Sequence, residues 1–462
     1  MTTRERVAVA AGAAVCVAGL LCAQTEPRVV GYYTMWGKST LPVSAVQFDK
    51  ITHINHAFAW PTASGGITSD PIIVDTALIG AAHRAGRKIL ISLGGASSST
   101  NFSTVVGDTA RRHAFVRNLV NYVVNNHYDG ADLDWEGPAN AADSINDVAL
   151  MRELREAFDA ADSALLLTMA IGSSPYGGRW RDYDSLNTYV DWFNVMTYDM
   201  DQGWSGKSGF NAALYYYAGM GDDYSVDQSI TYLSGSRRIP PAKLLLGVPF
   251  YGKKFNGTST FNTPFTPPMS WPFFRDIVVL LRSGGWTRYW EQVANVPYLS
   301  NVSSFITYDD SLSIALKCQY ALSHGLGGVM IWELSQDVVN QSQPLLAVIA
   351  SQVLTPPTEV EAPSSRPVTE ATLYENYPNP FNPTTSISYD IAGARDQGLG
   401  VSEVSLVVYD VLGREVAVLV NERKAPGSYE VKFDGSDFAS GVYLYRLTAG
   451  SHVETRSMVL MR

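Results

Sequence analysis

Residues 129–136 read Asp-Gly-Ala-Asp-Leu-Asp-Trp-Glu, in which acidic and apolar side chains alternate. Side chains two positions apart on a β-strand share one face, so Asp132, Asp134 and Glu136 point in one direction. Successive carboxyl groups then lie about 7 Å apart along the strand. Three acids in one row repel one another, and we expect the pKa of the last, Glu136, to be raised. The stretch therefore predicts a strand with an acidic inner face.

Other strand-like runs precede and follow this stretch and alternate with helical patterns. Helical periodicity is present over 75–85, 109–126 and 145–160. The strand-like runs cover 29–33, 51–59, 88–93, 130–136, 165–170, 193–199, 244–250 and 328–332. Eight strands separated by helices predict a (β/α)8 barrel, the TIM barrel of the α/β class, over residues 28–353. The alternative is a doubly wound open sheet, which would want a glycine-rich phosphate turn after an early strand, and the sequence has none there.

The position of Glu136 indicates its chemistry. It ends the fourth predicted strand, and barrels place their active sites at the carboxyl ends of their strands. An acid with a raised pKa at that place is suited to protonate a glycosidic oxygen. A metal site is the alternative for an oxygen cluster, but the intervening residues are not typical of turns. His53 and His56 fall on opposite strand faces and make no zinc pair, so we expect neither a metal nor another cofactor.

Composition narrows the class of partner. The 462 residues carry a formal net charge of −10, which argues against nucleic acid, because phosphate binding requires a basic face. Cys16 and Cys22 fall in the predicted leader, which leaves Cys318 as the cysteine of the mature chain. We expect it to be a buried small hydrophobe. The mature protein therefore depends on a large core rather than on disulfides.

The N-terminus predicts a secretory signal peptide over residues 1–23. Two arginines precede an apolar run over 7–22, and Ala23 offers a cleavage site. Cys22 also permits a lipoprotein interpretation, but Leu21 stands where a small residue is normally required. We therefore expect an exported, soluble mature chain.

The C-terminal part has a different pattern. Residues 354–371 are rich in Pro, Glu, Ser and Thr and predict a linker. After it, polar and apolar residues alternate over 385–391, 404–409, 415–419, 427–433, 442–448 and 454–460. This pattern predicts a small all-β, immunoglobulin-like sandwich over 372–462. All ten tryptophans precede the linker, so stacking on sugar rings belongs to the barrel.

Five motifs of the barrel resemble, in order, those of family 18 glycoside hydrolases. Residues 129–136 match the DGxDxDxE signature of that family at every fixed position, and 92–95 match its SxGG motif. Residues 196–199 resemble its MxYD motif, 249–252 its seventh strand, and 330–333 its eighth strand with a tryptophan floor. The resemblance implies a chitinase that acts on chitin or N-acetylglucosamine oligosaccharides.

The family's mechanism is substrate-assisted, because the acetamido group of the substrate is the nucleophile. By resemblance, Glu136 protonates the leaving oxygen while the acetamido carbonyl attacks the anomeric carbon, with retention. Asp134 holds the acetamido N–H, and Asp132 biases the orientation and protonation of Asp134. Tyr198 donates its hydroxyl to the acetamido oxygen. Trp332 supports the methyl group and the sugar face.

Aromatic residues that follow the predicted strands extend this site. Trp36, Trp60, Trp180 and Trp204 follow strands one, two, five and six, on the face that carries the chemistry. Packing in the core or a loop is an equal alternative for each of them, whereas the set favours a binding groove. The residues assigned to substrate binding are Trp332, Asp199, Met196, Trp36, Phe58, Trp60, Gly94, Gly95, Trp204 and Tyr251.

One segment departs from the family's pattern. Many members carry a compact α+β insertion between strands seven and eight, but residues 255–299 are short and contain a helix-like run over 273–282. We therefore expect no full insertion, a shallow open groove and endo-type cleavage. The alternatives are an endo-β-N-acetylglucosaminidase that acts on glycoprotein glycans and a chitin-binding lectin. Lectin relatives typically lack the acid, so Glu136 argues against the second.

The tail resembles the C-terminal sorting domain of type IX secretion cargo. The similarity is carried by residues 374–385, 409–416 and 441–447. It implies a type IX secretion partner, export through the outer membrane, and proteolytic removal or cell-surface attachment. An accessory immunoglobulin-like spacer is the alternative, with the same fold. We expect the protein to be a monomer.

Overall fold

The computed structural model describes residues 26–68, 74–96, 99–201, 203–217, 219–220, 224–354, 371–377, 379, 381–391, 402–410, 413–424, 427–450 and 452–460. They belong to two compact units, divided after residue 356. The predicted signal peptide and most of the predicted linker lie outside the described residues. Within the described ranges, no helix is long and apolar enough to cross a membrane.

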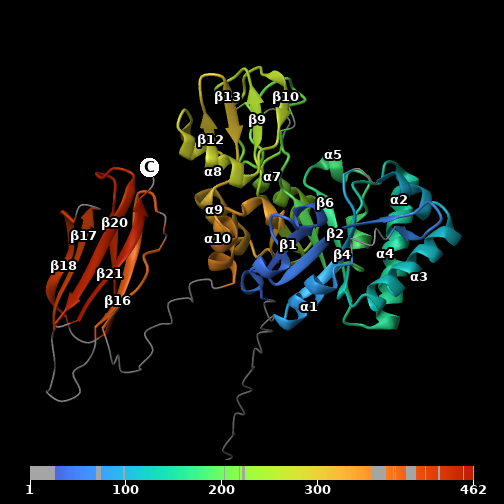
Figure 1. Cartoon of the computed structure of the whole chain (residues 1–462), viewed down its shortest axis with the longest axis horizontal. Coiled ribbons are helices and arrows are strands. Elements are labelled where there is room, and N and C mark those ends of the chain that lie inside the picture. The colour runs from blue at the N-terminus through green and yellow to red at the C-terminus, as the bar shows by residue number, and fades with distance from the viewer. Residues whose placement is uncertain are drawn as a thin grey trace, which may run out of the picture. The chain divides into compact units, whose positions relative to one another are not determined.

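The first unit contains a closed barrel of parallel strands (Figure 1). Its strands are β1 (Arg28–Thr34), β2 (His53–Pro61), β4 (Lys88–Gly94), β5 (Gly130–Asp134), β6 (Leu166–Gly172), β7 (Trp192–Met196), β8 (Leu244–Pro249) and β14 (Gly328–Trp332). Each strand pairs in parallel with its neighbours, and the β1–β2 pairing closes the ring. Residues of these strands are buried on both faces, as expected for a parallel sheet between helices. The predicted TIM barrel is confirmed.

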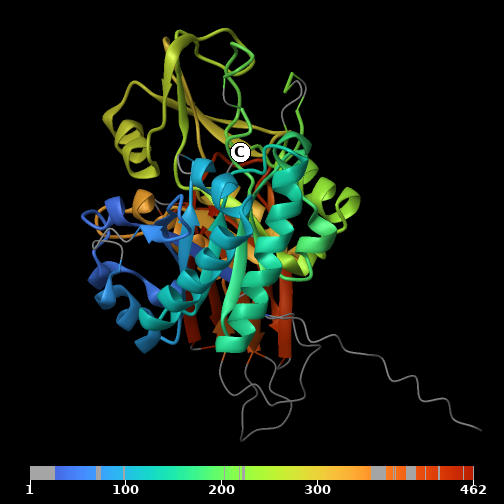
Figure 2. The same cartoon turned by 90° about the vertical axis from the view of Figure 1, so that its right-hand side faces the viewer.

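Helices lie outside the ring of strands (Figures 1 and 2). They are α1 (Thr76–Arg84), α2 (Ser99–Val106), α3 (Thr109–Asn125), α4 (Ala141–Ala161), α5 (Pro175–Gly178), α6 (Tyr183–Leu186), α7 (Val226–Thr231), α9 (Ser311–Ser323) and α10 (Pro344–Val353). The longest begin at residues whose side chains accept from free helical N–H groups: Asp108 for α3, Asn140 for α4 and Asp310 for α9. Such caps define where each crossover starts.

Two strands end earlier than the sequence predicts. The strand predicted over 130–136 ends at Asp134, and the strand predicted over 193–199 ends at Met196. The β5 ladder stops at its Gly94 pair, and the β7 ladder stops at Gly172, so no partner holds the next residues in the sheet. Glu136 and Tyr198 therefore sit in the loops beyond the strands, where strand phase does not determine their direction.

The segment after β8 is a complete α+β insertion, so the prediction of no full insertion is wrong. It contains an antiparallel sheet of β9 (Lys253–Asn256), β10 (Thr266–Ser270), β11 (Thr287–Glu291), β12 (Val296–Ser300) and β13 (Ser304–Thr307), with helix α8 (Phe274–Ser283). It lies at one end of the barrel in Figures 1 and 2, in yellow tones. The strands have four or five residues and include prolines, so their alternation is too brief to recognise in sequence. With the insertion present, the predicted shallow, open groove has no support.

The second unit is a β-sandwich. One sheet contains β15 (Thr372–Leu373), β16 (Thr384–Ile391) and β19 (Gly427–Asp434), and the other contains β17 (Ser402–Asp410), β18 (Glu415–Lys424), β20 (Gly441–Ala449) and β21 (His452–Leu460). Apolar side chains of both sheets, among them Tyr389 and Tyr445, share one core. Because one face of each sheet meets this core, the strands alternate in sequence as observed. The predicted sandwich is confirmed.

Candidate active site

Asp132 lies at the centre of a polar network inside the barrel. Its carboxylate is fully buried and accepts from Tyr32 Oη at 2.7 Å, Ser92 Oγ at 2.8 Å, Thr168 Oγ1 at 2.6 Å and Asn194 Nδ2 at 2.9 Å. The donors come from β1, β4, β6 and β7. Burial raises the pKa of Asp132, and the four hydrogen bonds oppose that rise. The network holds this carboxylate in one orientation.

Asp134, two residues further on, has different surroundings. Its side chain is buried, and its Oδ1 has no hydrogen-bond partner among the described residues. Burial raises the pKa of Asp134 well above its usual range, and the charges of Glu136 and Asp132 raise it further, while Arg181 lowers it. A buried acceptor without a donor is costly in the free protein. Its open lone pairs suit an N–H donor brought by a ligand.

Glu136 lies beyond the strand and is exposed at the mouth of the site. Reduced hydration of its carboxyl group raises the pKa of Glu136, and the negative charge of Asp199 adds to this rise. The pKa values of all three acids are raised, and loss of hydration is the largest cause each time. The predicted rise in the pKa of Glu136 is present, but loss of hydration rather than mutual repulsion is its largest cause, and Asp132 and Asp134 share the rise. The raised pKa favours the protonated form of Glu136, which at this exposed position can donate its proton to a substrate that enters from solvent.

The segment after β7 carries Tyr198 and Asp199. Asp199 adopts a positive φ of 58°, and its N–H donates to Asn211 Oδ1 at 3.1 Å, which holds this turn. Lys253 Nζ lies 2.9 Å from Asp199 Oδ1. Tyr198 is buried, and burial and the charge of Asp134 raise the pKa of its hydroxyl well above the usual range. The hydroxyl therefore remains a donor at any physiological pH.

Aromatic side chains surround these groups. The Trp332 ring stacks on Phe58 at a centroid distance of 5.7 Å and lies 5.2 Å from Tyr32. Tyr251 packs edge-on against Tyr198 at 6.1 Å. Phe58, Tyr198 and Tyr251 belong to one buried cluster, with Trp60, Met196 and Trp332 packed partly buried against it. The structure thus brings six of the predicted residues together.

Two predicted tryptophans are far more exposed. Trp36 is 59% exposed and lies 6.3 Å from Phe58, which places it at the edge of the cluster. Trp204 is 84% exposed in the loop after β7, and no ring contact links it to the cluster within the described parts of the chain. Trp180 lies partly exposed between α5 and α6. The structure therefore extends the site to Trp36 and leaves Trp204 outside the packed group.

Gly94 and Gly95 support the site from behind. A Cβ at Gly94 would lie 2.1 Å from the carbonyl oxygen of Asp134, and Gly94 has a φ of 123°. The N–H of Gly95 donates to that same carbonyl at 2.9 Å. A Cβ at Gly95 would lie 2.8 Å from the Phe58 ring. The pair permits close packing against the acidic strand, and the ligand contact predicted for Gly94 and Gly95 stays a prediction.

Sequence reasoning missed several residues that shape the site. Tyr32, Thr168 and Asn194 occupy predicted strands, and the inward phase of a polar residue is a signal that could have found them. Asn211 and Lys253 carry no such signal, because they reach Asp199 from a loop and from the insertion.

Comparison with known proteins agrees with this geometry. The family model "Glycosyl hydrolases family 18" matches residues 28–337, and the model "Secretion system C-terminal sorting domain" matches residues 375–461. The chain is 30% identical to "Chitinase A1" of Niallia circulans over 73% of this chain and 60% of that protein. It spans 55% to 60% of the lengths of the first three curated relatives it matches.

Comparison with solved structures points to the same family of proteins. The Group IV chitinase of Ostrinia furnacalis in complex with allosamidin superposes with a TM-score of 0.67 at 26% identity, over 72% of this chain and 100% of that one. A chitinase-like agglutinin from Robinia pseudoacacia superposes with a TM-score of 0.63 at 27% identity, over 70% of this chain and 98% of that one. The fold, the acidic row of Asp132, Asp134 and Glu136, and the family model therefore agree. The chain belongs to the family 18 glycosyl hydrolases.

Proposed function

We propose that this protein is a chitinase that hydrolyses β-1,4 bonds between N-acetylglucosamine units, with retention of configuration. The observation that carries the proposal is the contrast between Asp132, with four donors, and Asp134, whose buried Oδ1 has none among the described residues. An acetamido N–H supplies the donor that Asp134 lacks. The Tyr198 hydroxyl, close to the same acids, is a donor for the acetamido oxygen.

These groups divide the reaction between them. Glu136 gives its proton to the leaving glycosidic oxygen, and the acetamido oxygen attacks the anomeric carbon to form a cyclic oxazolinium. Asp134 holds the N–H and stabilises the positive charge, while Asp132 fixes Asp134. Glu136, now a carboxylate, takes a proton from the water that opens the ring. The Trp332 indole supports the sugar face, and Asp199 acts from the rim through its charge on Glu136.

Two other functions remain alternatives. An endo-β-N-acetylglucosaminidase would apply the same acids to a glycoprotein glycan, and a lectin would bind chitin without cleaving it. The likeness to a plant agglutinin makes the second a specific alternative. Endo-type cleavage stays a prediction, but it was inferred from a missing insertion, and the insertion is present.

The deciding experiment compares substrates. The full chain is incubated with a chitin hexamer, with insoluble chitin and with a high-mannose glycopeptide, and products are followed by mass spectrometry and by NMR of the new anomeric centre. Oligomer cleavage that first yields the β-anomer is expected. Cleavage of the glycopeptide alone would reject the chitinase proposal, and binding without turnover would favour a lectin. The lengths of the first products distinguish endo from exo cleavage.

The tail leads to a separate proposal on location. Because residues 375–461 match the sorting-domain model, the protein is exported through the outer membrane by the type IX machinery and released or attached at the cell surface. Fractionation of cells that carry or lack this secretion system tests it. Accumulation in the medium or on the surface in both strains would contradict the proposal.

A further inference from the structure

A buried ion pair lies behind the loop that carries Glu136. Arg181, between α5 and α6, is 3% exposed, and Asp147 on α4 is 1% exposed. Their closest atoms, Arg181 Nη1 and Asp147 Oδ2, are 3.1 Å apart. A buried pair of this kind contributes little net stability, because both charges lose their hydration. The contribution of this pair therefore lies in the groups that it holds in place.

The other branch of the guanidinium reaches the active-site loop. Arg181 Nη2 donates to the backbone carbonyl of Trp135, which also accepts from the N–H of Gly137 at 2.7 Å. Trp135 stands between Asp134 and Glu136, and its indole stacks on Phe102 at 5.5 Å. At this point the chain has left the β5 ladder. Side-chain contacts therefore replace sheet hydrogen bonds in fixing the peptide that joins the two acids.

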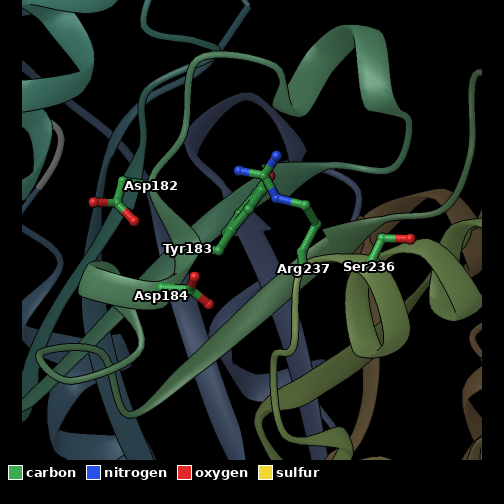
Figure 3. A pocket seen from close by; sticks show the side chains of 5 residues that line it. All are labelled: Asp182, Tyr183, Asp184, Ser236 and Arg237. Atoms are coloured by element: carbon green, nitrogen blue, oxygen red, sulfur yellow. The ribbon is translucent and has the colours of Figure 1, made fainter.

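Arg181 is in turn held by a second arginine, Arg237. Arg237 donates through Nη2 to the carbonyl of Arg181, and its guanidinium lies 4.9 Å from the centre of the Tyr183 ring. Figure 3 shows Arg237 and Tyr183 in a small polar pocket that is lined by Asp182, Tyr183, Asp184, Ser236 and Arg237. Through Arg181, the pocket wall is connected to the acidic row.

We infer that Arg181, oriented by Asp147, is a positioning residue that holds the Trp135 peptide and thereby aims Asp134 and Glu136 at the substrate. The inference rests on the proposed function of these acids. Arg181 is also the cation whose charge lowers the pKa of Asp134 against the larger effect of burial. A rigid fork that satisfies a carboxylate and a carbonyl together is a capacity of arginine that lysine lacks.

The test removes the pair without leaving a lone buried charge. In Arg181→Met/Asp147→Leu, apolar side chains of similar size replace both partners, so the barrel is expected to fold. Misplacement of the acids lowers kcat on the chitin hexamer by about 10²-fold with little change in KM. Loss of the cation moves the pH profile of kcat/KM toward higher pH. Parental kcat and pH profile in this variant would overturn the inference.

A second buried ion pair provides the matched control. Lys317 Nζ lies 2.6 Å from both carboxylate oxygens of Asp309, and both side chains are buried. Lys317→Met/Asp309→Leu creates the same kind of change elsewhere and is expected to leave kcat, KM and the pH profile as in the parent. An equal loss of activity in this control would show a general core effect and overturn the inference.

Two further measurements keep the test decisive. Arg181→Lys keeps the charge but loses the fork, so we expect the parental pH profile with a reduced kcat. A profile displaced as far as in the double variant would contradict the role of the charge. The Asp134 carboxyl, titrated by 13C NMR without substrate, is expected to show a higher pKa in the double variant. Failure of the parent to cleave chitin oligomers would reject the proposed function, whereas an unchanged titration would reject the role of Arg181.

Discussion

Carboxyl groups at the floor and at the mouth of the site have opposite surroundings. At the floor, Asp132 accepts four hydrogen bonds from four strands. At the mouth, Asp134 has an unpartnered oxygen among the described residues, and Glu136 is exposed in a loop. A satisfied buried carboxylate is fixed in place, whereas an unsatisfied one is ready to bind. The contrast teaches that this row of acids combines a rigid support with a reactive end.

The largest expected effect is at the mouth. Glu136→Gln removes the proton donor but keeps the size of the side chain, so kcat on chitin oligomers should fall by about 10²–10⁴-fold. Oligosaccharide affinity, measured by calorimetry, should remain close to that of the parent. Substantial residual activity would show that another group is the acid.

The second prediction compares stability at the two places. Asp132→Ala leaves four buried donors without their acceptor and should lower the free energy of unfolding by about 1–3 kcal/mol. Asp134→Ala removes an acid that is unfavourable to bury next to other acids, so stability should be unchanged or increased. Urea denaturation of both variants measures the difference. Equal losses in the two variants would remove the distinction between floor and mouth.

The third prediction concerns pH. The charge of Asp199 raises the pKa of Glu136, which keeps the acid protonated to higher pH. Asp199→Asn removes this charge and lowers the pKa of Glu136. The alkaline limb of kcat/KM, where the acid loses its proton, should therefore move to lower pH. A limb that stays in place or moves upward would mean that another group titrates there.

The smallest effect is expected from a single hydroxyl at the floor. Tyr32→Phe removes one of four donors to Asp132 and should lower stability by about 1 kcal/mol. Tyr33→Phe is the matched control, because the buried Tyr33 hydroxyl donates to the carbonyl of Leu41 at 2.8 Å instead. Thermal denaturation should show similar losses, and kcat should fall in Tyr32→Phe alone. Equal kcat values in the two variants would indicate that the floor tolerates three donors.

Local patterns in the sequence were sufficient for the barrel, the sandwich and the acidic row. Strand, helix and turn signals act over a few residues, and the motif at 129–136 is continuous. The insertion was missed because strands of four or five residues with prolines carry too little alternation. The ends of β5 and β7 were misplaced because a strand stops where its partner's ladder stops, which local sequence does not contain.

The sequence by itself determined which chemical groups this protein has and which predicted strands carry them. The tertiary structure decided how each group behaves. Tyr32 and Asp132 are 100 residues apart, and Arg181 reaches Trp135 across 46 residues. Hydrogen bonding, burial and charge at such contacts act through space, so they separate a supporting carboxylate from a reactive one only after the barrel has closed.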